Sequence, residues 1–234
     1  MSISLEGAVV LVTGANGGLG EEFVAQSLER GATKVYATAR SAREWSDPRV
    51  VPLHLDVLDT ASIEAAALAA ADTTVVINNA GITKRGALAT ADIADIRLIF
   101  DANFFGALEV ARVFAPVLAA NGGGVLLNVH SALSWLGTGA AYSASKAALW
   151  SATNTLRLEL APQGTHVVGL HLGYTATPMT VDVDAPKGEA SDVVRSALDG
   201  IEAGDYEVLA DDASVYVKSK LSGSIVDMYP QLVG

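Results

Sequence analysis

The chain has 234 residues, of which 50% are hydrophobic and 18% are charged, so it is long enough for one domain with a substantial core. Its formal net charge of −11 at pH 7 excludes an extensively basic surface of the kind that nucleic-acid binding requires. It contains no cysteine, so neither a disulfide nor a thiolate metal site can form. That composition is compatible with a reducing cytoplasm, which is the location we expect.

Neither a membrane span nor a signal peptide is expected. No uninterrupted apolar run reaches the length of about 18 residues that indicates a transmembrane helix. The first residues, MSISLEGAVVLVTG, lack a basic segment followed by an apolar stretch and a small-residue cleavage site. They are typical of a lead into a first strand.

Strand-like and helix-like stretches alternate along the whole chain, beginning with the continuous apolar run AVVLVT, which is typical of a strand buried on both faces. The predicted strands are Ala8–Thr13, Lys34–Ala39, Val50–Asp56, Thr74–Asn78, Val125–Val129, Thr165–His171 and Tyr206–Leu209. The predicted helices span about 20–30, 59–72, 93–120, 142–160 and 191–203. Strands joined by helical crossovers predict an α/β fold, a doubly wound, Rossmann-like parallel sheet of about seven strands with helices on both faces. With no linker, repeat or change of composition, we expect one domain over residues 1–234.

A glycine-rich turn, Thr13-Gly14-Ala15-Asn16-Gly17-Gly18-Leu19-Gly20, joins the first strand to the first helix. Glycines there let the backbone approach a pyrophosphate, which binds at the free N–H groups of the helix start. The turn satisfies TGxxxGxG through Gly14, Gly18 and Gly20, and also TGxxGxxG through Gly14, Gly17 and Gly20. The turn alone does not choose between these spacings, and a plain structural turn is the alternative.

The end of the second strand indicates which dinucleotide would bind. NAD-selective sites place an acidic residue there for the ribose hydroxyls, whereas this strand ends Ala39-Arg40-Ser41. An arginine can pair with a 2′-phosphate. We therefore predict NADP(H), with Arg40 and Ser41 at the phosphate; the alternative is that Arg40 is a solvated residue after a strand.

The segment Tyr142-Ser143-Ala144-Ser145-Lys146 places a phenol and an ammonium four residues apart, on one face of a helix. A nearby ammonium is expected to lower the pKa of the phenol, so that it can exchange a proton with a substrate oxygen. Alone, the pair also fits a packed tyrosine beside a solvated lysine.

Taken in order, these features resemble the short-chain dehydrogenases/reductases, in their compact single-domain form. The resemblance covers Gly7 to about Leu209 and rests on the glycine turn, Asp56-Val57, Asn78-Asn79-Ala80-Gly81, Asn103, Ser131 and Tyr142 with Lys146. The longer relatives that use TGxxGxxG carry an added substrate domain, for which this chain has no residues.

The resemblance implies a role for each matching residue. Tyr142 would donate the proton in reduction, Ser131 would hydrogen-bond the substrate carbonyl, and Lys146 would hold the nicotinamide ribose and tune Tyr142. Asn103 would anchor a water in a proton relay, although a simple helix–helix hydrogen bond is the alternative. The residues expected at the cofactor are Gly14, Asn16, Gly18, Leu19, Gly20, Arg40, Ser41, Asp56, Val57, Asn79, Ala80, Gly81, Tyr142, Lys146, Gly173, Thr175 and Thr177. Asn79 is as readily structural as cofactor-touching.

The substrate side departs from the family pattern. Ser131 follows His130 where small residues are common, the loop to Tyr142 is short, and Leu172 replaces the usual proline before Gly173. The residues expected at the substrate are Leu133, Trp135, Tyr174 and Met179, within the wider set Leu133–Leu136 and a lid-like loop over 178–188. Their apolar character predicts a hydrophobic ketone or alcohol; packing of Trp135 and Leu136 on a neighbouring subunit is the alternative.

Other site chemistries find less support. The four histidines lack a ligand spacing, so no metal site is expected, and Ser131 lacks the GxSxG context of a hydrolase nucleophile. Two other functions stay open: a cofactor-sensing protein without turnover, and a carrier-linked 3-ketoacyl reductase. Relatives assemble through their two long helices, so we expect a homodimer or homotetramer that binds a small carbonyl or alcohol substrate, with neither nucleic acid nor a membrane as partner.

Overall fold

The computed structural model describes residues 4–41 and 43–233, and their strands form a single parallel sheet of seven strands in the order β3-β2-β1-β4-β5-β6-β7. The strands are β1 (Val9–Thr13), β2 (Lys34–Ala39), β3 (Val50–His54), β4 (Val75–Asn78), β5 (Val125–Val129), β6 (His166–His171) and β7 (Glu207–Leu209). The predicted α/β fold is confirmed, and each predicted strand is present, with several shorter by one or two residues. The order reverses between β1 and β4, and ligands of doubly wound sheets bind at the carboxyl ends of the strands at such a point.

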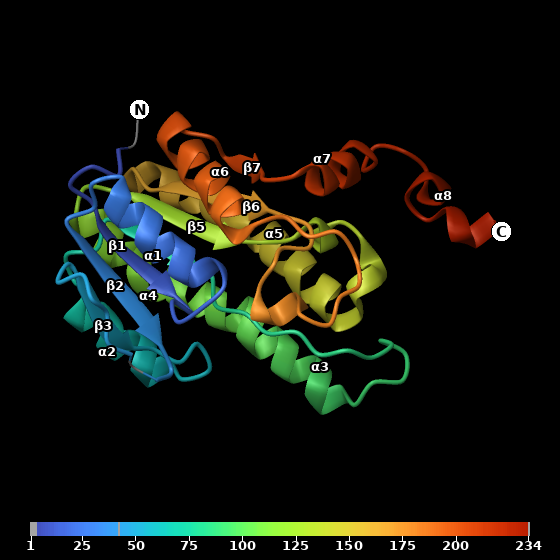
Figure 1. The fold of residues 1–234 in the computed structure, drawn as a ribbon, viewed down its shortest axis with the longest axis horizontal. Coiled ribbons are helices and arrows are strands. Elements are labelled where there is room, and N and C mark those ends of the chain that lie inside the picture. The colour runs from blue at the N-terminus through green and yellow to red at the C-terminus, as the bar shows by residue number, and fades with distance from the viewer. Residues whose placement is uncertain (1–3, 42, 234) are drawn as a thin grey trace.

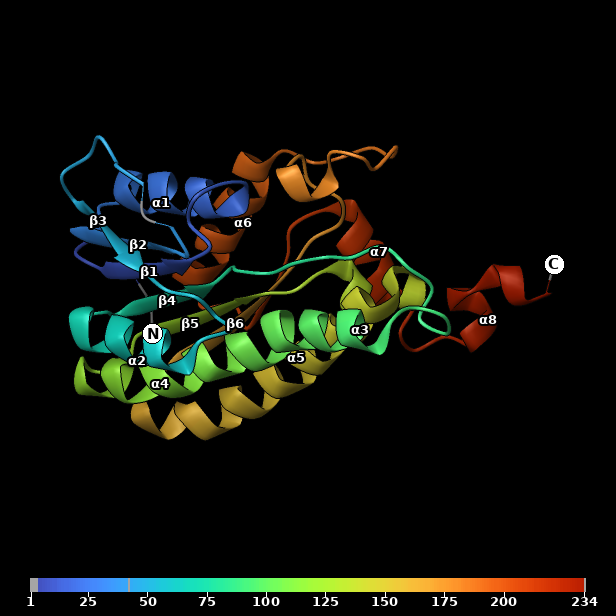
Figure 2. The same cartoon turned by 90° about the horizontal axis from the view of Figure 1, so that it is seen from below.

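Helices cover both faces of the sheet (Figure 1). Figure 2 shows α1 and α6 on one face and α2, α4 and α5 on the other. The helices are α1 (Leu19–Glu29), α2 (Thr60–Ala69), α3 (Ile93–Phe100), α4 (Ala107–Ala120), α5 (Ala140–Leu160), α6 (Ala190–Ala203), α7 (Asp212–Ser219) and α8 (Ile225–Met228). The side chains of Asp59 and Asp92 accept from the backbone two residues on and so begin α2 and α3.

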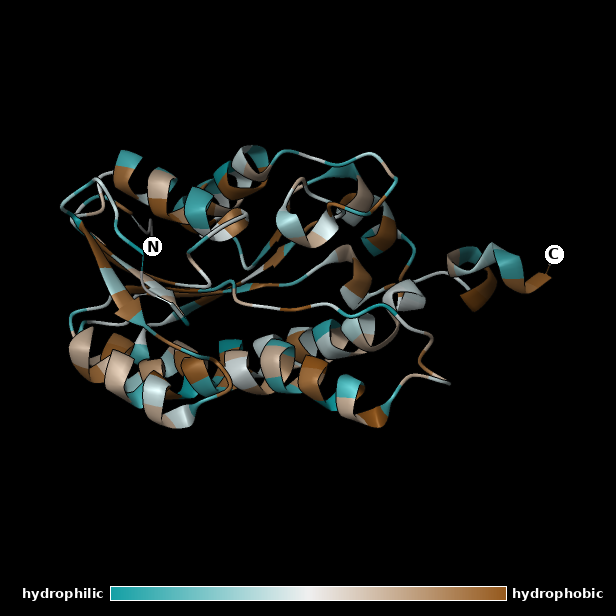
Figure 3. Ribbon diagram, turned by 60° about the horizontal axis from the view of Figure 1, so that its bottom comes forward, coloured by the Kyte–Doolittle hydropathy of each residue, from teal (hydrophilic) through white to brown (hydrophobic). Residues whose placement is uncertain are grey.

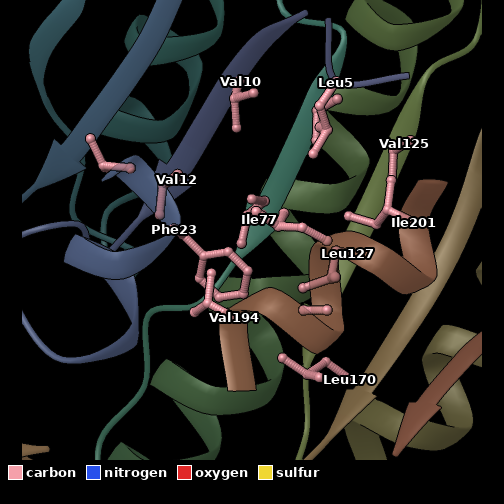
Figure 4. Close-up of a cluster of buried hydrophobic side chains, with 14 of the residues drawn as sticks. Leu5, Val10, Val12, Phe23, Ile77, Val125, Leu127, Leu170, Val194 and Ile201 are labelled. Atoms are coloured by element: carbon pink, nitrogen blue, oxygen red, sulfur yellow. The ribbon is translucent and has the colours of Figure 1, made fainter. Parts of the chain in front are cut away.

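The core follows from the alternation of strand side chains between the two faces of the sheet. In Figure 4, strand residues such as Val12, Ile77 and Leu127 face Phe23 of α1 and Val194 of α6, and all five are fully buried. The opposite face packs Leu11, Val76 and Leu126 against α2, α4 and α5. Figure 3 shows the result as largely hydrophobic strands between helices that alternate hydrophobic and hydrophilic residues.

The predicted helix over 93–120 is continuous but not uniformly α-helical. Residues Asp101–Gly106 form a π-helical segment between α3 and α4. By length and composition alone, the 28 residues Ile93–Ala120 could cross a membrane. In the fold, however, α4 packs on β4, β5 and α5, as the core helix of a folded domain does.

The C-terminal segment was not anticipated beyond the seventh strand. It contains α7, which packs on β7, and then α8 and a short 3-10 turn over Pro230–Val233, which extend away from the rest of the molecule (Figures 1 and 2). Tyr229 ties this segment to the body, since its hydroxyl accepts a hydrogen bond from the Gly137 N–H at 2.8 Å.

Candidate active site

The glycine turn lies at the carboxyl end of β1, where the strand order reverses. Gly14 and Gly18 have positive φ angles of 66° and 56°, a conformation that favours glycine. The start of α1 has no side-chain cap. Its Gly20 N–H donates to the Gly17 carbonyl oxygen at 3.1 Å, and the neighbouring N–H groups of the first turn can receive an anion. These features fit a dinucleotide pyrophosphate.

Gly20 is required by close packing within this turn. A Cβ atom there would lie 2.1 Å from the Gly14 carbonyl oxygen and 2.9 Å from Nδ2 of Asn79. The same Nδ2 donates to the carbonyl oxygens of Thr13 at 2.9 Å and Gly14 at 3.2 Å. Asn79 therefore holds the turn itself, the structural role that the sequence left open.

We expect Gly20→Ala to destabilise the protein and to weaken dinucleotide binding, because the added methyl group pushes the start of α1 away from the backbone of Gly14 and Ala15. Overpacking of this kind costs about 1–3 kcal/mol. Gly17→Ala is the matched control, since a Cβ atom there meets nothing within 4 Å. Thermal unfolding and NADPH titration of both variants check the prediction; equal behaviour of the two would contradict it.

Two arginines stand near the end of β2. Arg40 is exposed, and among the described residues its guanidinium makes no ion pair. Arg43, which the sequence analysis missed, contacts the Asn16 carbonyl oxygen at 3.4 Å and Oε1 of Glu21 at 2.7 Å. The Asn16 side chain donates to the Ser41 carbonyl oxygen at 2.8 Å, so the β2 loop and the glycine turn are joined. The position of Arg43, only three residues after Arg40, was the sequence signal that could have identified it.

The other predicted cofactor residues lie on the loops that follow β3 and β4. The Asp56 carboxylate accepts from the Leu58 N–H at 3.0 Å, and the Val57 carbonyl oxygen lies only 2.6 Å from where a Cβ of Gly106 would be. Gly81 borders the site more closely: a Cβ there would lie 3.2 Å from Oδ1 of Asn103 and 3.8 Å from Nζ of Lys146. Ala80 packs on the glycine turn, with its Cα 3.0 Å from a Cβ position at Gly14.

Asn103 lies within the π-helical segment and is fully buried. Its Oδ1 accepts from the Ile82 N–H at 2.8 Å, and its Nδ2 donates to the Ile82 carbonyl oxygen at 2.9 Å and to Oγ of Ser145 at 3.2 Å. It thus joins the loop after β4 to α5, beside Lys146. Single π-helical turns occur frequently at functional sites, and this wide turn is the structural reason for an asparagine in mid-helix.

Ser131, Tyr142 and Lys146 come together from the end of β5 and the first turns of α5. The Lys146 ammonium is buried, donates to the Val129 carbonyl oxygen at 2.7 Å and lies 5.8 Å from the centre of the Tyr142 ring. Burial lowers the pKa of Lys146 to about 8. The Ser131 hydroxyl donates to the Leu172 carbonyl oxygen at 3.3 Å and caps the Leu133 N–H at 3.1 Å.

The expected lowering of the phenol pKa is not found. Burial raises the pKa of Tyr142 to about 12, and the nearby Ser131 hydroxyl opposes this rise only in part. Desolvation disfavours the phenolate, while the Lys146 ammonium is engaged by the Val129 carbonyl. In this structure the phenol therefore holds its proton at neutral pH.

The segment after β6 lines a cleft beside the glycine turn. The side chain of Thr177 lies 3.3 Å from a Cβ position at Gly18, and an open cleft of about 400 Å³ is lined by Ala176, Thr177, Pro178, Val181 and Lys187. The Gly173 N–H donates to Oδ2 of Asp211 at 2.6 Å. Thr175 is buried, and a bridge to Gly188 closes the base of the predicted lid loop.

The four predicted substrate residues do not share one environment. Tyr174 and Met179 are exposed and Leu133 is half-buried. Trp135 is instead buried; it packs with Val217 and stacks on His171, with ring centroids 3.9 Å apart. Trp135 therefore packs inside the molecule. This differs from both sequence-based expectations, which placed it at the substrate or at a subunit interface.

Histidines and carboxylates do not gather into a metal site: within residues 4–41 and 43–233, no group of three or more such side chains could hold an ion. His130 is buried beside His171, and burial holds its pKa well below the usual range.

Comparison with known proteins agrees with this geometry. Residues 8–188 match the family model for short chain dehydrogenase. The chain is 34% identical over 202 residues to the ketoacyl reductase HetN of Nostoc sp., covering 79% of this chain and 70% of that one. It is 31% identical over 229 residues to a 3-alpha-(or 20-beta)-hydroxysteroid dehydrogenase of Mycobacterium tuberculosis, covering 92% and 87%.

A solved structure of a short chain dehydrogenase from Burkholderia cenocepacia, in complex with NADP, is 35% identical and superposes with a TM-score of 0.93 over 99% of this chain and 100% of that one. Its fold is the one described above. The chain therefore belongs to the short-chain dehydrogenase/reductase family.

Proposed function

We propose that residues 1–234 act as a single dinucleotide-binding catalytic domain, an NADP(H)-dependent oxidoreductase that interconverts a ketone or aldehyde with an alcohol. The observation that carries this proposal is the convergence of Tyr142, Lys146 and Ser131 near the carboxyl ends of β4 and β5, where Nζ of Lys146 lies 3.8 Å from a Cβ position at Gly81. The ammonium of Lys146 lies over the face of the Tyr142 ring, and the nearby Ser131 hydroxyl lowers the pKa of the same phenol, against the effect of burial. A sensor without turnover would not need all three groups.

Each group has a distinct task in carbonyl reduction. NADPH supplies the hydride when bound. Negative charge then grows on the substrate oxygen, where the hydroxyls of Ser131 and Tyr142 donate hydrogen bonds. The proton of Tyr142 passes to that oxygen and gives the alcohol. Lys146 stabilises the phenolate that remains, and it holds the nicotinamide ribose, as in the family.

Preference for NADP(H) over NAD(H) is supported by Arg40 and by the lack of an acid at the end of β2. Arg43 adds a second positive group above the glycine turn, although Glu21 neutralises part of its charge. The Burkholderia cenocepacia relative, which is in complex with NADP, supports the same preference.

We expect Arg40→Met to lower kcat/KM for NADPH by about 10-fold to 150-fold, which corresponds to the loss of a charge-assisted hydrogen bond of about 1.5–3 kcal/mol, and to leave NADH kinetics unchanged. Arg49→Met is the control, because Arg49 precedes β3 and pairs with Asp47 at 2.7 Å. Steady-state kinetics with both cofactors decide: a wild-type preference for NADH would overturn the assignment.

The substrate we propose is a small hydrophobic carbonyl compound, because the exposed side chains beside the cleft include Tyr174, Met179 and Val181. A carrier-linked 3-ketoacyl substrate is the second candidate, favoured by the similarity to a protein named ketoacyl reductase. A panel of small ketones, aldehydes and 3-ketoacyl thioesters separates the two. Tight NADPH binding without oxidation of NADPH by any of them would instead favour the cofactor sensor.

We further propose a cytoplasmic homodimer or homotetramer formed through the long helix over 93–120, which carries Asn103, and α5, which carries Tyr142. Phe105 of the first helix and Leu158 of the second are exposed apolar side chains, 56% and 78% accessible, and they support burial of these helices in an interface. Light scattering would give the number of subunits.

A further inference from the structure

A buried polar cluster touches the backbone of Ser131. His171, the last residue of β6, is fully buried, and its Nδ1 lies 3.2 Å from the Ser131 carbonyl oxygen. Because a carbonyl oxygen only accepts, Nδ1 must carry the proton of this hydrogen bond. On the other side of the ring, Nε2 lies 3.6 Å from Oε1 of Glu207, the first residue of β7, and the two groups form an ion pair when His171 also carries a proton on Nε2.

The orientation of the His171 ring is coupled to the substrate loop. Its plane stacks on the indole of Trp135 at an angle of 14° and a centroid distance of 3.9 Å. Trp135 follows Ser131 by four residues. A rotation of His171 would therefore disturb both the hydrogen bond to the Ser131 backbone and the packing of the loop.

Glu207 links this cluster to the helix that carries the other candidate catalytic groups. Its Oε1 accepts from Nε1 of Trp150 at 2.8 Å. Trp150 lies on α5 eight residues after Tyr142 and four after Lys146, so all three share a helical face. Glu207 also forms an ion pair with Lys218 of α7. The neighbouring His171, and then Lys218 and Trp150, hold the pKa of Glu207 far below its usual range, so it is a carboxylate at neutral pH.

We propose that Glu207 is a positioning residue: through His171 and Trp150 it holds the Ser131 backbone in place relative to Tyr142 on α5. This inference rests on the proposed oxidoreductase function, since Glu207 would position groups that take part in that reaction. Glu207 lies on β7, far along the chain from the groups it serves, and no sequence motif marks it.

The test compares Glu207→Ala, Glu207→Gln and the control Lys218→Met. We expect Glu207→Ala to lower kcat for carbonyl reduction by about 10-fold to 100-fold, the effect of misplacing a reacting group by about 1 Å, with an unchanged Kd for NADPH. Glu207→Gln should restore most of kcat, because its amide oxygen still accepts from Trp150 and its amide nitrogen can donate to a neutral His171. Lys218→Met removes another partner of Glu207 and should leave kcat near the wild-type value.

A double-mutant cycle shows whether Glu207 acts through His171. His171→Asn retains a donor toward the Ser131 carbonyl but does not reach Glu207, so Glu207→Ala should lower kcat much less in that background than in the wild type. Fully additive losses, an unchanged kcat in Glu207→Ala, or an equal loss in Glu207→Ala and Lys218→Met would overturn the proposal.

A second readout does not depend on turnover. Crystal structures of the three variants should show the Ser131 hydroxyl displaced from the Tyr142 hydroxyl in Glu207→Ala alone. If the wild-type protein reduces no carbonyl compound, the proposed function fails, and the Ser131 position then decides the role of Glu207. An unmoved Ser131 would refute that role.

Discussion

Tyr142→Phe is expected to lower the rate of ketone reduction by about 10²–10⁴-fold, the range that a positioned proton donor contributes. Phenylalanine retains the ring that lies over Lys146 but has no proton to give to the substrate oxygen. NADPH binding and thermal stability should change little, because neither the glycine turn nor the core contacts the missing hydroxyl. Single-turnover oxidation of NADPH, with a parallel binding titration, provides the measurement.

Tyr216→Phe is the matched control for this substitution. Tyr216 lies exposed on α7, so loss of its hydroxyl should leave turnover unchanged. Near-normal turnover in Tyr142→Phe would refute the acid role, and loss of NADPH binding in that variant would show that the phenol serves the cofactor instead.

Lys146→Met is expected to lower turnover on the order of 10²-fold or more, the cost of removing a preorganised electrostatic group from an active site. The variant also makes a prediction for stability. Burial lowers the pKa of Lys146 to about 8, from 10.5 in the unfolded chain. Between these values the unfolded state binds the proton more tightly, so the wild-type free energy of unfolding rises with pH.

The window from pH 8 to pH 10 isolates this effect. Tyr142 changes the free energy of unfolding mainly above pH 10, because its pKa is raised from 10.0 to about 12 in the folded state. Over this window, the free energy of unfolding of the wild type should rise by an amount on the order of 2 kcal/mol, with a slope of at most about 1.4 kcal/mol per pH unit. This rise should be absent in Lys146→Met. Denaturant unfolding at several pH values measures it.

Lys220→Met, on the C-terminal segment, is the control and should follow the wild-type curve, since Lys220 is only half-buried. A wild-type free energy of unfolding that falls between pH 8 and pH 10 relative to Lys146→Met would contradict the assignment of a depressed lysine pKa.

The fold was largely predictable because local signals agreed with one another. Continuous apolar runs such as Val125–Val129 and the glycine turn at Gly14 marked strands and a crossover without any tertiary information. The π-helical segment around Asn103 was not predictable, because it depends on the pairing of Asn103 with the Ile82 backbone, 21 residues away. Nor was α8, whose partly buried Met228 and Tyr229 rest on the substrate loop.

The proximity of Tyr142 and Lys146 was predictable from the sequence, but the electrostatics of the candidate site were not. The four-residue spacing placed Tyr142 and Lys146 on one face, yet the sign of the phenol pKa shift depended on burial, which sequence spacing does not report. Trp135 read as a substrate contact because it is aromatic and near Ser131; its stacking on His171 comes from β6, 36 residues further on. The role proposed for Glu207 arises in the same way, from strands and helices that meet only in the folded sheet.

Transfer of deuterium from NADPH labelled at the hydride position tests the central claim most directly. The protein and its Tyr142→Phe variant are incubated with the labelled cofactor and the carbonyl panel, and the products are examined by mass spectrometry. The wild-type protein should place deuterium on the carbinol carbon of at least one alcohol, and Tyr142→Phe should do so at a rate lower by about 10²–10⁴-fold. Tight binding of NADPH with no deuterium in any product would contradict the assignment of this chain as an oxidoreductase.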